Sequence, residues 1–289
     1  MERISVRVWT EVCKCIGTED EVFVRRQVVE CNETIFKHIH RKNIQCFMPI
    51  ISGSRVEGLI QPDSDIDLMY VFNFTFVSDN SDFLNGYIIM DTDNIKPGFV
   101  RLVCSDKLEY YGEFIEAMIE KNDGLILSSL LFRDQMVDHM RETFTDTIAH
   151  GPCALYDIGF NIEVDTLICL SCNTWPRVAT EWIARVRINN WPSPDLISDI
   201  VRDGCLLVPI GNPNSQESYL EWRLSFSLAE KNLYILSIIH NSCVTKSKIY
   251  FVPIFSKQPY SFALRKKTSS GTKRLMKWVS DEYCPNFLK

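Results

Sequence analysis

A Gly-Ser pair followed by two closely spaced aspartates is the part of the sequence most suited to chemistry. Gly53 and Ser54 end one apolar run, and Asp65 and Asp67 open another, with a single apolar residue between them. Residues two apart in a strand point to the same face, so the two carboxylates repel each other unless a cation lies between them. Hard divalent ions prefer oxygen ligands, and a glycine beside a hydroxyl lets backbone N–H groups approach a phosphate. The pattern indicates a nucleoside-triphosphate site with metal-assisted phosphoryl or nucleotidyl transfer.

A two-metal site of this kind needs a third carboxylate from a neighbouring strand, because two ions about 4 Å apart must both be neutralised. Residues 161–170 alternate polar and apolar side chains before the segment becomes apolar, which is typical of a strand with one buried face. Asp165 is the best candidate in this segment. Glu163 shares its face and competes with it, and for either residue the alternative is a solvated surface carboxylate.

Two further motifs point to a family. The Gly-Ser pair and the Asp-x-Asp motif resemble the G-S…[DE]-h-[DE]-h signature of the polymerase-beta-like nucleotidyltransferases. Residues 222–227 read W-R-L-S-F-S and follow a V-D-x-L strand and a T-W-P turn, which resembles the Mab-twenty-one-like family, including cyclic GMP–AMP synthase and the cGAS-like receptors. The segment H-G-P-C at residues 150–153 resembles a loop of invertebrate members. The resemblance covers roughly residues 20–240.

The resemblance implies an α/β (α+β) fold with two lobes. A polymerase-beta-like mixed sheet, preceded by a long spine helix, would carry the metal site, and a helical second lobe would close over the nucleotide. Gly53 and Ser54 would hold the triphosphate, and Asp65, Asp67 and Asp165 would be catalytic and bind two Mg²⁺ or Mn²⁺ ions. ATP and GTP would be the substrates, and the product would be a cyclic dinucleotide second messenger of the kind used in innate immunity.

The W-R-L-S-F-S block supplies the other residues that the resemblance assigns to nucleotide binding. In active relatives its arginine and serines lie near the bases and phosphates, which points to Arg223, Ser225 and Ser227 here, with Glu230 as a weaker candidate. The alternative is that the apolar residues of the block are the core of a helix start and that Arg223 is an exposed neighbour.

Hydrophobic periodicity predicts the elements that must position these residues. Residues 20–42 carry apolar side chains at three- and four-residue spacing, which indicates an amphipathic helix. The apolar residues of that helix are Val24, Val28, Cys31, Ile35 and Ile39. Strands are expected near 48–52, 66–73, 86–91, 99–104 and 158–170, and helices near 109–121 and 127–143. Thr180 is expected to cap a helix that holds Trp182, Ile183 and Val186.

Three regions are expected along the chain: a core lobe with the spine helix at 1–175, a helical lobe at 176–245 and a divergent tail at 246–289. The Trp-Pro turn near 171–178 marks the lobe boundary. The tail departs from the family, because an apolar segment and then a Lys/Ser/Thr/Gly-rich stretch replace the leucine- and lysine-rich helices of relatives. We expect it to be poorly ordered, and Lys277 is its one candidate for a phosphate contact.

The charge of the chain argues against a long nucleic-acid groove. The net charge is −6 although residues 265–289 hold seven basic and two acidic residues, so the rest of the chain is acidic. Duplex binding depends on Lys and Arg contacts to phosphates. A local patch at Arg185, Arg187 and Arg202 is the candidate that is left, and an ordinary solvated helix face is the favoured interpretation. Neither a membrane span nor a signal peptide is indicated, so we expect a cytoplasmic protein, with the nucleus as the alternative.

The eleven cysteines do not predict a zinc site. Cys169 and Cys172 form a lone C-x-x-C without a second pair at suitable spacing, so buried reduced thiols are the better interpretation. Cyclic GMP–AMP synthase has a zinc-binding insertion after its W-R-L-S-F-S block, whereas this chain offers only His240 and Cys243 there. We therefore expect no structural zinc.

Two rival functions are consistent with the same residues. The chain could be a catalytically inactive binding or signalling protein that retains the nucleotide-binding fold, because its tail differs from that of active relatives. It could also be a nucleotidyltransferase that modifies RNA ends or small molecules, which would need a separate acceptor. Intact carboxylates argue against complete loss of metal binding.

Overall fold

The computed structural model describes the chain from residue 10 to residue 237, with several gaps. The described ranges are 10–43 without 12 and 15, 47–58, 66–79, 88–104, 112–121, 124–143, 148–150, 153–157, 163–187 and 191–237. Asp65, His240, Cys243, Lys277 and the whole predicted tail lie outside these ranges. No helix in the described ranges combines the length and apolar character that a membrane span requires.

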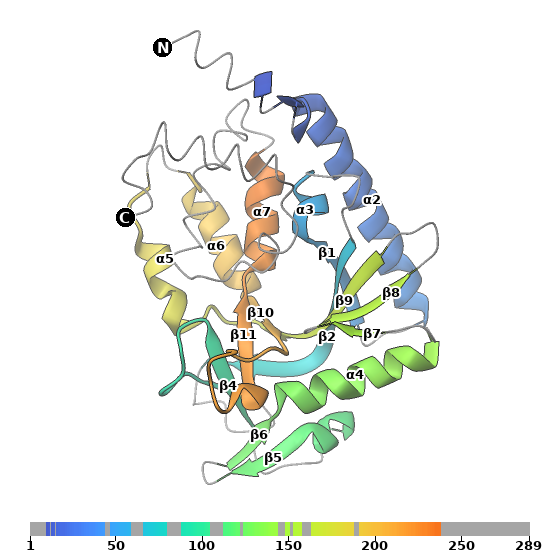
Figure 1. Cartoon of the computed structure of the whole chain (residues 1–289). Coiled ribbons are helices and arrows are strands. Elements are labelled where there is room, and N and C mark those ends of the chain that lie inside the picture. Colours follow the sequence, from blue (N-terminus) through green and yellow to red (C-terminus); the bar gives the residue numbers. More distant parts are fainter. Residues whose placement is uncertain are drawn as a thin grey trace.

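One mixed sheet runs through the described part of the chain (Figure 1). Its strands are β1 (Phe47–Ser52), β2 (Ile66–Ser78), β3 (Ile88–Asp91), β4 (Phe99–Cys104), β5 (Met118–Lys121), β6 (Gly124–Leu127), β7 (Ile148–His150), β8 (Cys153–Asp157), β9 (Glu163–Cys172), β10 (Cys205–Val208) and β11 (Glu221–Ser225). The order is β1-β2-β3-β4-β11-β10-β9-β8-β7, with β6 on β4 and β5 on β6. In addition β2 pairs with β9, so the strands from β2 to β9 in this order form a closed ring of paired strands.

Helices lie on both sides of this sheet (Figure 1). They are α2 (Glu19–Asn43), α3 (Gly53–Val56), α4 (Ser129–Thr143), α5 (Thr180–Ala184), α6 (Pro194–Asp203) and α7 (Ser227–Ser237), with 3₁₀ turns η2 (Gly112–Ala117), η3 (Arg177–Ala179) and η5 (Ser218–Leu220). This mixture of helices with a mixed sheet confirms the predicted α/β class. Residues 176–237 contribute β10 and β11 to the sheet as well as three α-helices, and the division into lobes stays a prediction.

The two faces of the sheet belong to different cores. Along β9, Leu170 and Cys172 pack in the cluster that contains Phe132 of α4. The alternate residues Leu167 and Cys169 pack in a second cluster, against which Leu228 of α7 lies. Successive side chains of a strand point to opposite faces, so α4 and α7 cover opposite sides of β9.

Helix α2 has the predicted extent, but the apolar residues that indicated an amphipathic helix do not face the core. The apolar side chains that indicated this helix are exposed: Val24 by 58%, Val28 by 53% and Ile35 by 56%, and Cys31 is exposed as well, whereas the Ile39 side chain lies outside the part of the chain that the structure describes. The buried residues are Arg26, Val29 and Glu33. Arg26 and Glu33 are buried because backbone groups of other segments need hydrogen-bond partners there, and such polar contacts escape a prediction based on hydrophobic spacing.

Glu33 joins α2 to two other elements. Its carboxylate accepts a hydrogen bond from the Ile51 backbone N–H of β1 at 3.2 Å and pairs with Lys231 of α7. Lys37 Nζ lies 2.6 Å from the same carboxylate. Burial raises the pKa of Glu33, but the hydrogen bonds from Lys231 and Lys37 outweigh it and hold the pKa below its ordinary value. Glu33 is therefore an ionised carboxylate that holds α2 against β1 and α7.

Three local predictions also need correction. The helix predicted near 109–121 is a 3₁₀ turn followed by strand β5, within the part of that range that is described. Thr180 is the first residue of α5 rather than its cap, and Val186 lies beyond the end of α5 and is fully exposed. Residues 222–225 of the W-R-L-S-F-S block lie in β11 and only Ser227 belongs to α7, so the block is mainly a strand and not a helix start, although Trp222 and Leu224 are buried as that interpretation required.

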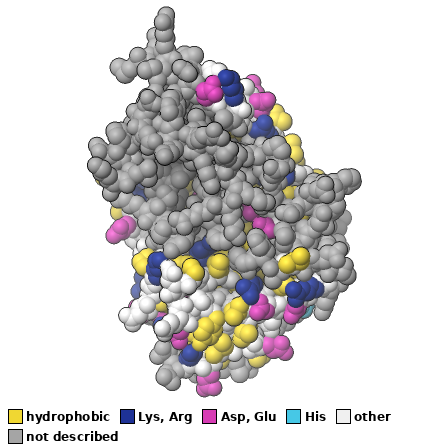
Figure 2. All heavy atoms as spheres, in the orientation of Figure 1, with side chains coloured by type: hydrophobic (Ala, Val, Ile, Leu, Met, Phe, Trp, Pro, Cys, Tyr) yellow, Lys and Arg dark blue, Asp and Glu magenta, His cyan; other side chains and the backbone are white. Residues whose placement is uncertain are grey.

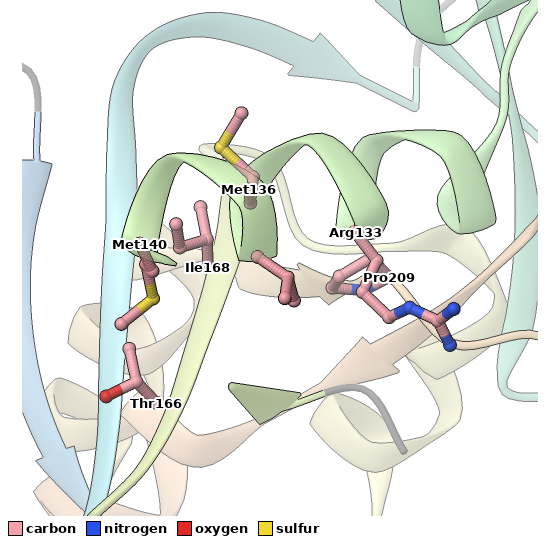
Figure 3. Close-up of a pocket in the computed structure, with 7 residues that line it drawn as sticks. Arg133, Met136, Met140, Thr166, Ile168 and Pro209 are labelled. Atoms are coloured by element: carbon pink, nitrogen blue, oxygen red, sulfur yellow. The ribbon is translucent and has the colours of Figure 1, made fainter. Parts of the chain in front are cut away.

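A small cavity lies between α4 and β9, on the face of the sheet that α4 covers (Figure 3). Its lining residues are Arg133, Met136, Val137, Met140, Thr166, Ile168 and Pro209. The Thr166 hydroxyl is buried and has no hydrogen-bond partner among the described residues. An unsatisfied buried hydroxyl lowers stability, because it has lost its bonds to water without replacement.

Thr166→Val should therefore stabilise the protein. Valine has the same shape without the hydroxyl, so we expect the free energy of unfolding to rise by ~1 kcal/mol, measured by urea denaturation. Thr174→Val is the matched control, because Thr174 Oγ1 accepts a hydrogen bond from the Asp79 backbone N–H at 3.3 Å. The control should lose about 1 kcal/mol. Equal destabilisation by the two substitutions would mean that the Thr166 hydroxyl has a partner after all.

Candidate functional site

Three polar residues form one row across three neighbouring strands. In the antiparallel pair of β1 and β2, Ser52 lies opposite Asp67. In the parallel pair of β2 and β9, Asp67 lies opposite Asp165. Neighbouring strands are about 4.8 Å apart, and opposite residues share a face. The Asp67 and Asp165 side chains therefore project side by side from adjacent strands. Both aspartates are half-buried.

This register distinguishes between Asp165 and Glu163, the two candidates on β9 for the third carboxylate. Asp165 is the residue opposite Asp67, whereas Glu163 is the first residue of β9 and lies opposite Asp157 of β8. The register therefore favours Asp165 as the partner of Asp67. The catalytic role of either aspartate stays a prediction, as does that of Asp65, which precedes β2 and lies outside the described residues.

Gly53 is required where β1 turns into α3. Its φ angle is +73°, which residues other than glycine rarely adopt. A Cβ atom added there would collide with the Asp67 carboxylate. The backbone of the turn thus lies directly against one of the two aspartates. Ser54, the next residue, is half-buried in the single turn of α3. The structure brings the Gly-Ser pair and Asp67 together, as the sequence predicted.

Helix α2 holds the far end of this turn. Arg26 Nε donates a hydrogen bond to the Glu57 carbonyl at 3.0 Å, and Arg25 Nη1 donates to the Gly58 carbonyl at 3.3 Å. Gly58 has a φ angle of +75°, and an added Cβ would come within 2.9 Å of Val22. The turn is therefore fixed from both sides, by Asp67 at its start and by α2 at its end.

Arg223 projects from β11 on the same side of the sheet as the two aspartates. Arg223 lies opposite Val208 in the pair of β10 and β11, and Val208 packs in the cluster that contains Leu167 and Cys169. Leu167 and Cys169 are on the side of β9 that faces away from α4, which is also the side of Asp165. Arg223 is half-buried rather than exposed. Burial lowers its pKa, and the neighbouring Cys153 and Glu230 partly oppose that effect. A cation removed from water in this way is suited to an anionic partner.

Glu230 of α7 connects Arg223 electrostatically to the Gly-Ser turn. Burial raises the pKa of Glu230 to about 7, and the nearby Glu57 carboxylate adds to this rise while Arg223 opposes it. Glu57 ends the turn that begins at Gly53, so charges from α3, β11 and α7 act on one another. The sequence patterns did not single out Glu57, although its place within the Gly-Ser segment was a usable signal.

Ser225 and Ser227 lie where β11 passes into α7. Their hydroxyl oxygens are 2.8 Å apart, and the Ser227 backbone N–H donates to Ser225 Oγ at 3.4 Å. Both residues are half-buried. The junction thus presents two hydroxyl groups shortly beyond Arg223, and their role in nucleotide binding stays a prediction.

The oxygen donors of this site suit a hard divalent cation. Asp67 and Asp165 supply carboxylates from adjacent strands, and oxygen-only donors are the set that magnesium and manganese prefer. Within the described ranges no group of three or more His, Cys, Asp or Glu residues is placed to hold a metal ion. The third predicted ligand, Asp65, lies outside those ranges.

The predicted basic patch consists of arginines with partners in the protein. Arg187 donates to the carbonyls of Trp182 at 2.6 Å and Ile183 at 3.0 Å, and its guanidinium lies over the Trp182 ring. Arg202 pairs with Asp199 at 2.9 Å. On the face shown in Figure 2, the described basic side chains are interspersed with acidic ones. Arg185 and Arg187 lie beyond the end of α5 and only Arg202 lies on a helix, so the three arginines do not share one helix face as the favoured interpretation required.

Cys169 and Cys172 are buried free thiols, as predicted. Burial raises the pKa of Cys169. The partner of Cys172 was not evident from the sequence: it is Cys205, which lies opposite in the pair of β9 and β10. A hydrogen bond from Cys205 lowers the pKa of Cys172 to about 7, burial opposes the shift, and Thr174 adds to it.

A comparison with protein families agrees with the resemblance noted in the sequence. The family described as Mab-21 protein nucleotidyltransferase domain matches residues 83–234, which is more than half of the chain. The matched range contains Asp165, Arg223, Ser225 and Ser227. The Gly-Ser turn and Asp67 precede it, and strand pairing of β2 with β9 connects them to it.

Gly53→Ala should weaken ligand binding more than it lowers the stability of the fold. The new methyl group would displace the Asp67 carboxylate or the turn, so we expect nucleotide and Mn²⁺ binding to weaken at least ~10-fold, measured by calorimetry. Gly124→Ala is the matched control, since Gly124 also has a positive φ of +117° but an added Cβ would meet only Val103 at 3.9 Å. The control should lose stability and keep its binding. Normal binding by Gly53→Ala would contradict the proposed contact.

Proposed function

The chain belongs to the Mab-21 nucleotidyltransferase family, and we propose that it is a metal-dependent nucleotidyltransferase of the cGAS-like type. It would use nucleoside triphosphates to make a cyclic dinucleotide second messenger. The observation that carries the proposal is the row of Asp67 and Asp165 on adjacent strands, with the Gly53 turn packed against Asp67.

The carboxylate row and the Gly-Ser turn have separate roles in this proposal. Asp67 and Asp165, together with Asp65, would hold Mg²⁺ or Mn²⁺. The metal, when bound, supplies Lewis-acid activation of a ribose hydroxyl and neutralises charge on the triphosphate. Gly53 permits the close approach of backbone and phosphate, and Ser54 offers a hydroxyl donor beside it. Arg25 and Arg26 support these roles by fixing the end of the turn.

Arg223, Ser225 and Ser227 would bind the nucleotide from the other side of the site. Arg223 offers a permanent charge with five donors, which suits phosphate or a base edge. Its place on the face of the aspartates supports this role. Glu230 lies within electrostatic reach of Arg223 and would orient it while the site is empty.

The two-lobed arrangement of the family belongs to the same proposal. Helix α2 would act as the spine, since Glu33 connects it to β1 and to Lys231 of α7. Residues 176–245 would form the lobe that closes over the nucleotide. A cytoplasmic location, a role in innate immunity and activation by a ligand are further proposals, and the acidic composition does not favour a nucleic-acid activator.

Product analysis tests this function directly. The full chain would be incubated with ATP, GTP, CTP and UTP and with Mg²⁺ or Mn²⁺, alone and with double-stranded RNA or DNA, and the products identified by mass spectrometry. We expect a dinucleotide product that depends on the metal. The Asp65→Asn/Asp67→Asn variant should reduce its formation at least ~100-fold, because the carboxylates that hold the metal are gone.

The other outcomes identify the rival functions. Metal-dependent nucleotide binding without any product would indicate an inactive family member that acts by binding. Transfer of a nucleotide to added RNA or to a small molecule would indicate a different acceptor. A product made equally well by the double variant would contradict the assigned metal site.

A further inference from the structure

Glu33 on the inner side of α2 contacts two other elements through a single oxygen atom. Oε2 of Glu33 accepts a hydrogen bond from the Ile51 backbone N–H of β1 at 3.2 Å, and the same atom pairs with Lys231 Nζ of α7. Lys37 Nζ lies 2.6 Å from the other oxygen, Oε1, but Lys37 belongs to α2 itself. The Oε2 contacts therefore join three elements, whereas the Lys37 contact stays within one helix.

Both partners of this oxygen lie close to residues that the proposed function assigns to the ligand. Ile51 of β1 precedes Gly53 of the Gly-Ser turn by two residues. Lys231 follows Ser227, the first residue of α7, by four residues, so the two lie on one face of the helix about one turn apart. In the view of Figure 1, β1 and α3 lie between α2 and α7. Glu33 thus connects the turn that would hold the triphosphate with the helix on the other side of the nucleotide.

The carboxylates of Glu57 and Glu230 repel each other between the turn and α7. Burial raises the pKa of Glu230 and the Glu57 carboxylate raises it further, as expected for two like charges. The contact of Glu33 with Lys231, the residue directly after Glu230, is an attraction between the same parts of the protein. Glu33 is only 5% exposed, so salt and water screen this attraction little. The separation of the turn from α7 therefore depends on Glu33.

We propose that Glu33 is a positioning residue for nucleotide binding, which fixes the Gly-Ser turn and α7 at the separation that a nucleoside triphosphate spans. The role rests on the proposed function. Glu33 acts through Ile51 and Lys231 rather than by contact with the ligand. A ligand that contacts both sides gains affinity from the fixed separation, because the two sides need no ordering when it binds. A ligand that contacts the turn alone gains nothing from it.

Calorimetry of the full chain with Mn²⁺ and either ATP or inorganic tripolyphosphate tests this role. Tripolyphosphate offers phosphates to the turn but has no ribose or base for the α7 side. We expect Lys231→Met and Glu33→Gln each to weaken ATP binding at least ~10-fold and tripolyphosphate binding no more than ~2-fold. In Lys231→Met the Glu33 carboxylate keeps its pair with Lys37, so this variant leaves no buried charge unpaired. The double variant should bind ATP as weakly as either single variant, because both substitutions remove the same contact.

Two control variants separate this role from a general loss of stability. Lys37→Met removes the contact within α2 and should leave the ratio of the ATP and tripolyphosphate affinities unchanged. Phe132→Leu changes a fully buried side chain of α4 on the opposite face of the sheet. It should lower stability and likewise leave the ratio unchanged.

The outcomes distinguish this role from the function on which it rests. Equal weakening of ATP and tripolyphosphate binding in Lys231→Met would overturn the positioning role, as would additive losses in the double variant. Normal ATP binding by both single variants, beside a wild-type chain that binds ATP, would overturn the positioning role alone. A wild-type chain that binds neither ligand in the presence of Mn²⁺ would overturn the proposed function and this role together.

Discussion

The parallel pairing of β2 with β9 is the contact on which the candidate site depends. It brings together two segments that are far apart in the sequence and sets Asp67 opposite Asp165. A shift of one residue would turn one aspartate to the face that α4 covers, because side chains of a strand alternate. Met69, Leu167 and Cys169 oppose such a shift, since each is buried on the same face as the aspartates. The apolar core thereby fixes the distance between two charged groups.

A second constraint is that α2 must serve several elements at once. Its inner side gives hydrogen bonds to the end of the Gly-Ser turn through Arg25 and Arg26, and Glu33 binds β1 and α7. A buried carboxylate is tolerated there because its charge is neutralised by Lys37 and Lys231. This demand for polar contacts explains why Arg26 and Glu33 are buried while Val24 and Val28 lie on the exposed side of the helix.

Sequence patterns predicted which strand residues share a face better than they predicted the packing of the helices. The Asp-x-Asp motif and the alternation around Asp165 were local signals of strands with a shared face, and the register agrees with them. Periodicity found the extent of α2 but not its orientation, because spacing alone does not tell which of two faces meets the protein. The alternative that placed a helix start in the W-R-L-S-F-S block was wrong, because the block alternates as a strand and only its last serine begins α7. Glu57 and Cys205 were missed because their partners are distant in sequence.

Asp67 and Asp165 must together hold a divalent cation if the proposed function is correct. Titration of Mn²⁺ into the full chain, followed by electron paramagnetic resonance of the free ion, measures this binding without any assumption about products. We expect Asp67→Asn and Asp165→Asn each to weaken the tightest Mn²⁺ site at least ~10-fold, whereas Asp138→Asn on the exposed side of α4 should leave it unchanged. Equal Mn²⁺ affinity in wild type and in both site variants would contradict a metal site at this pair of strands.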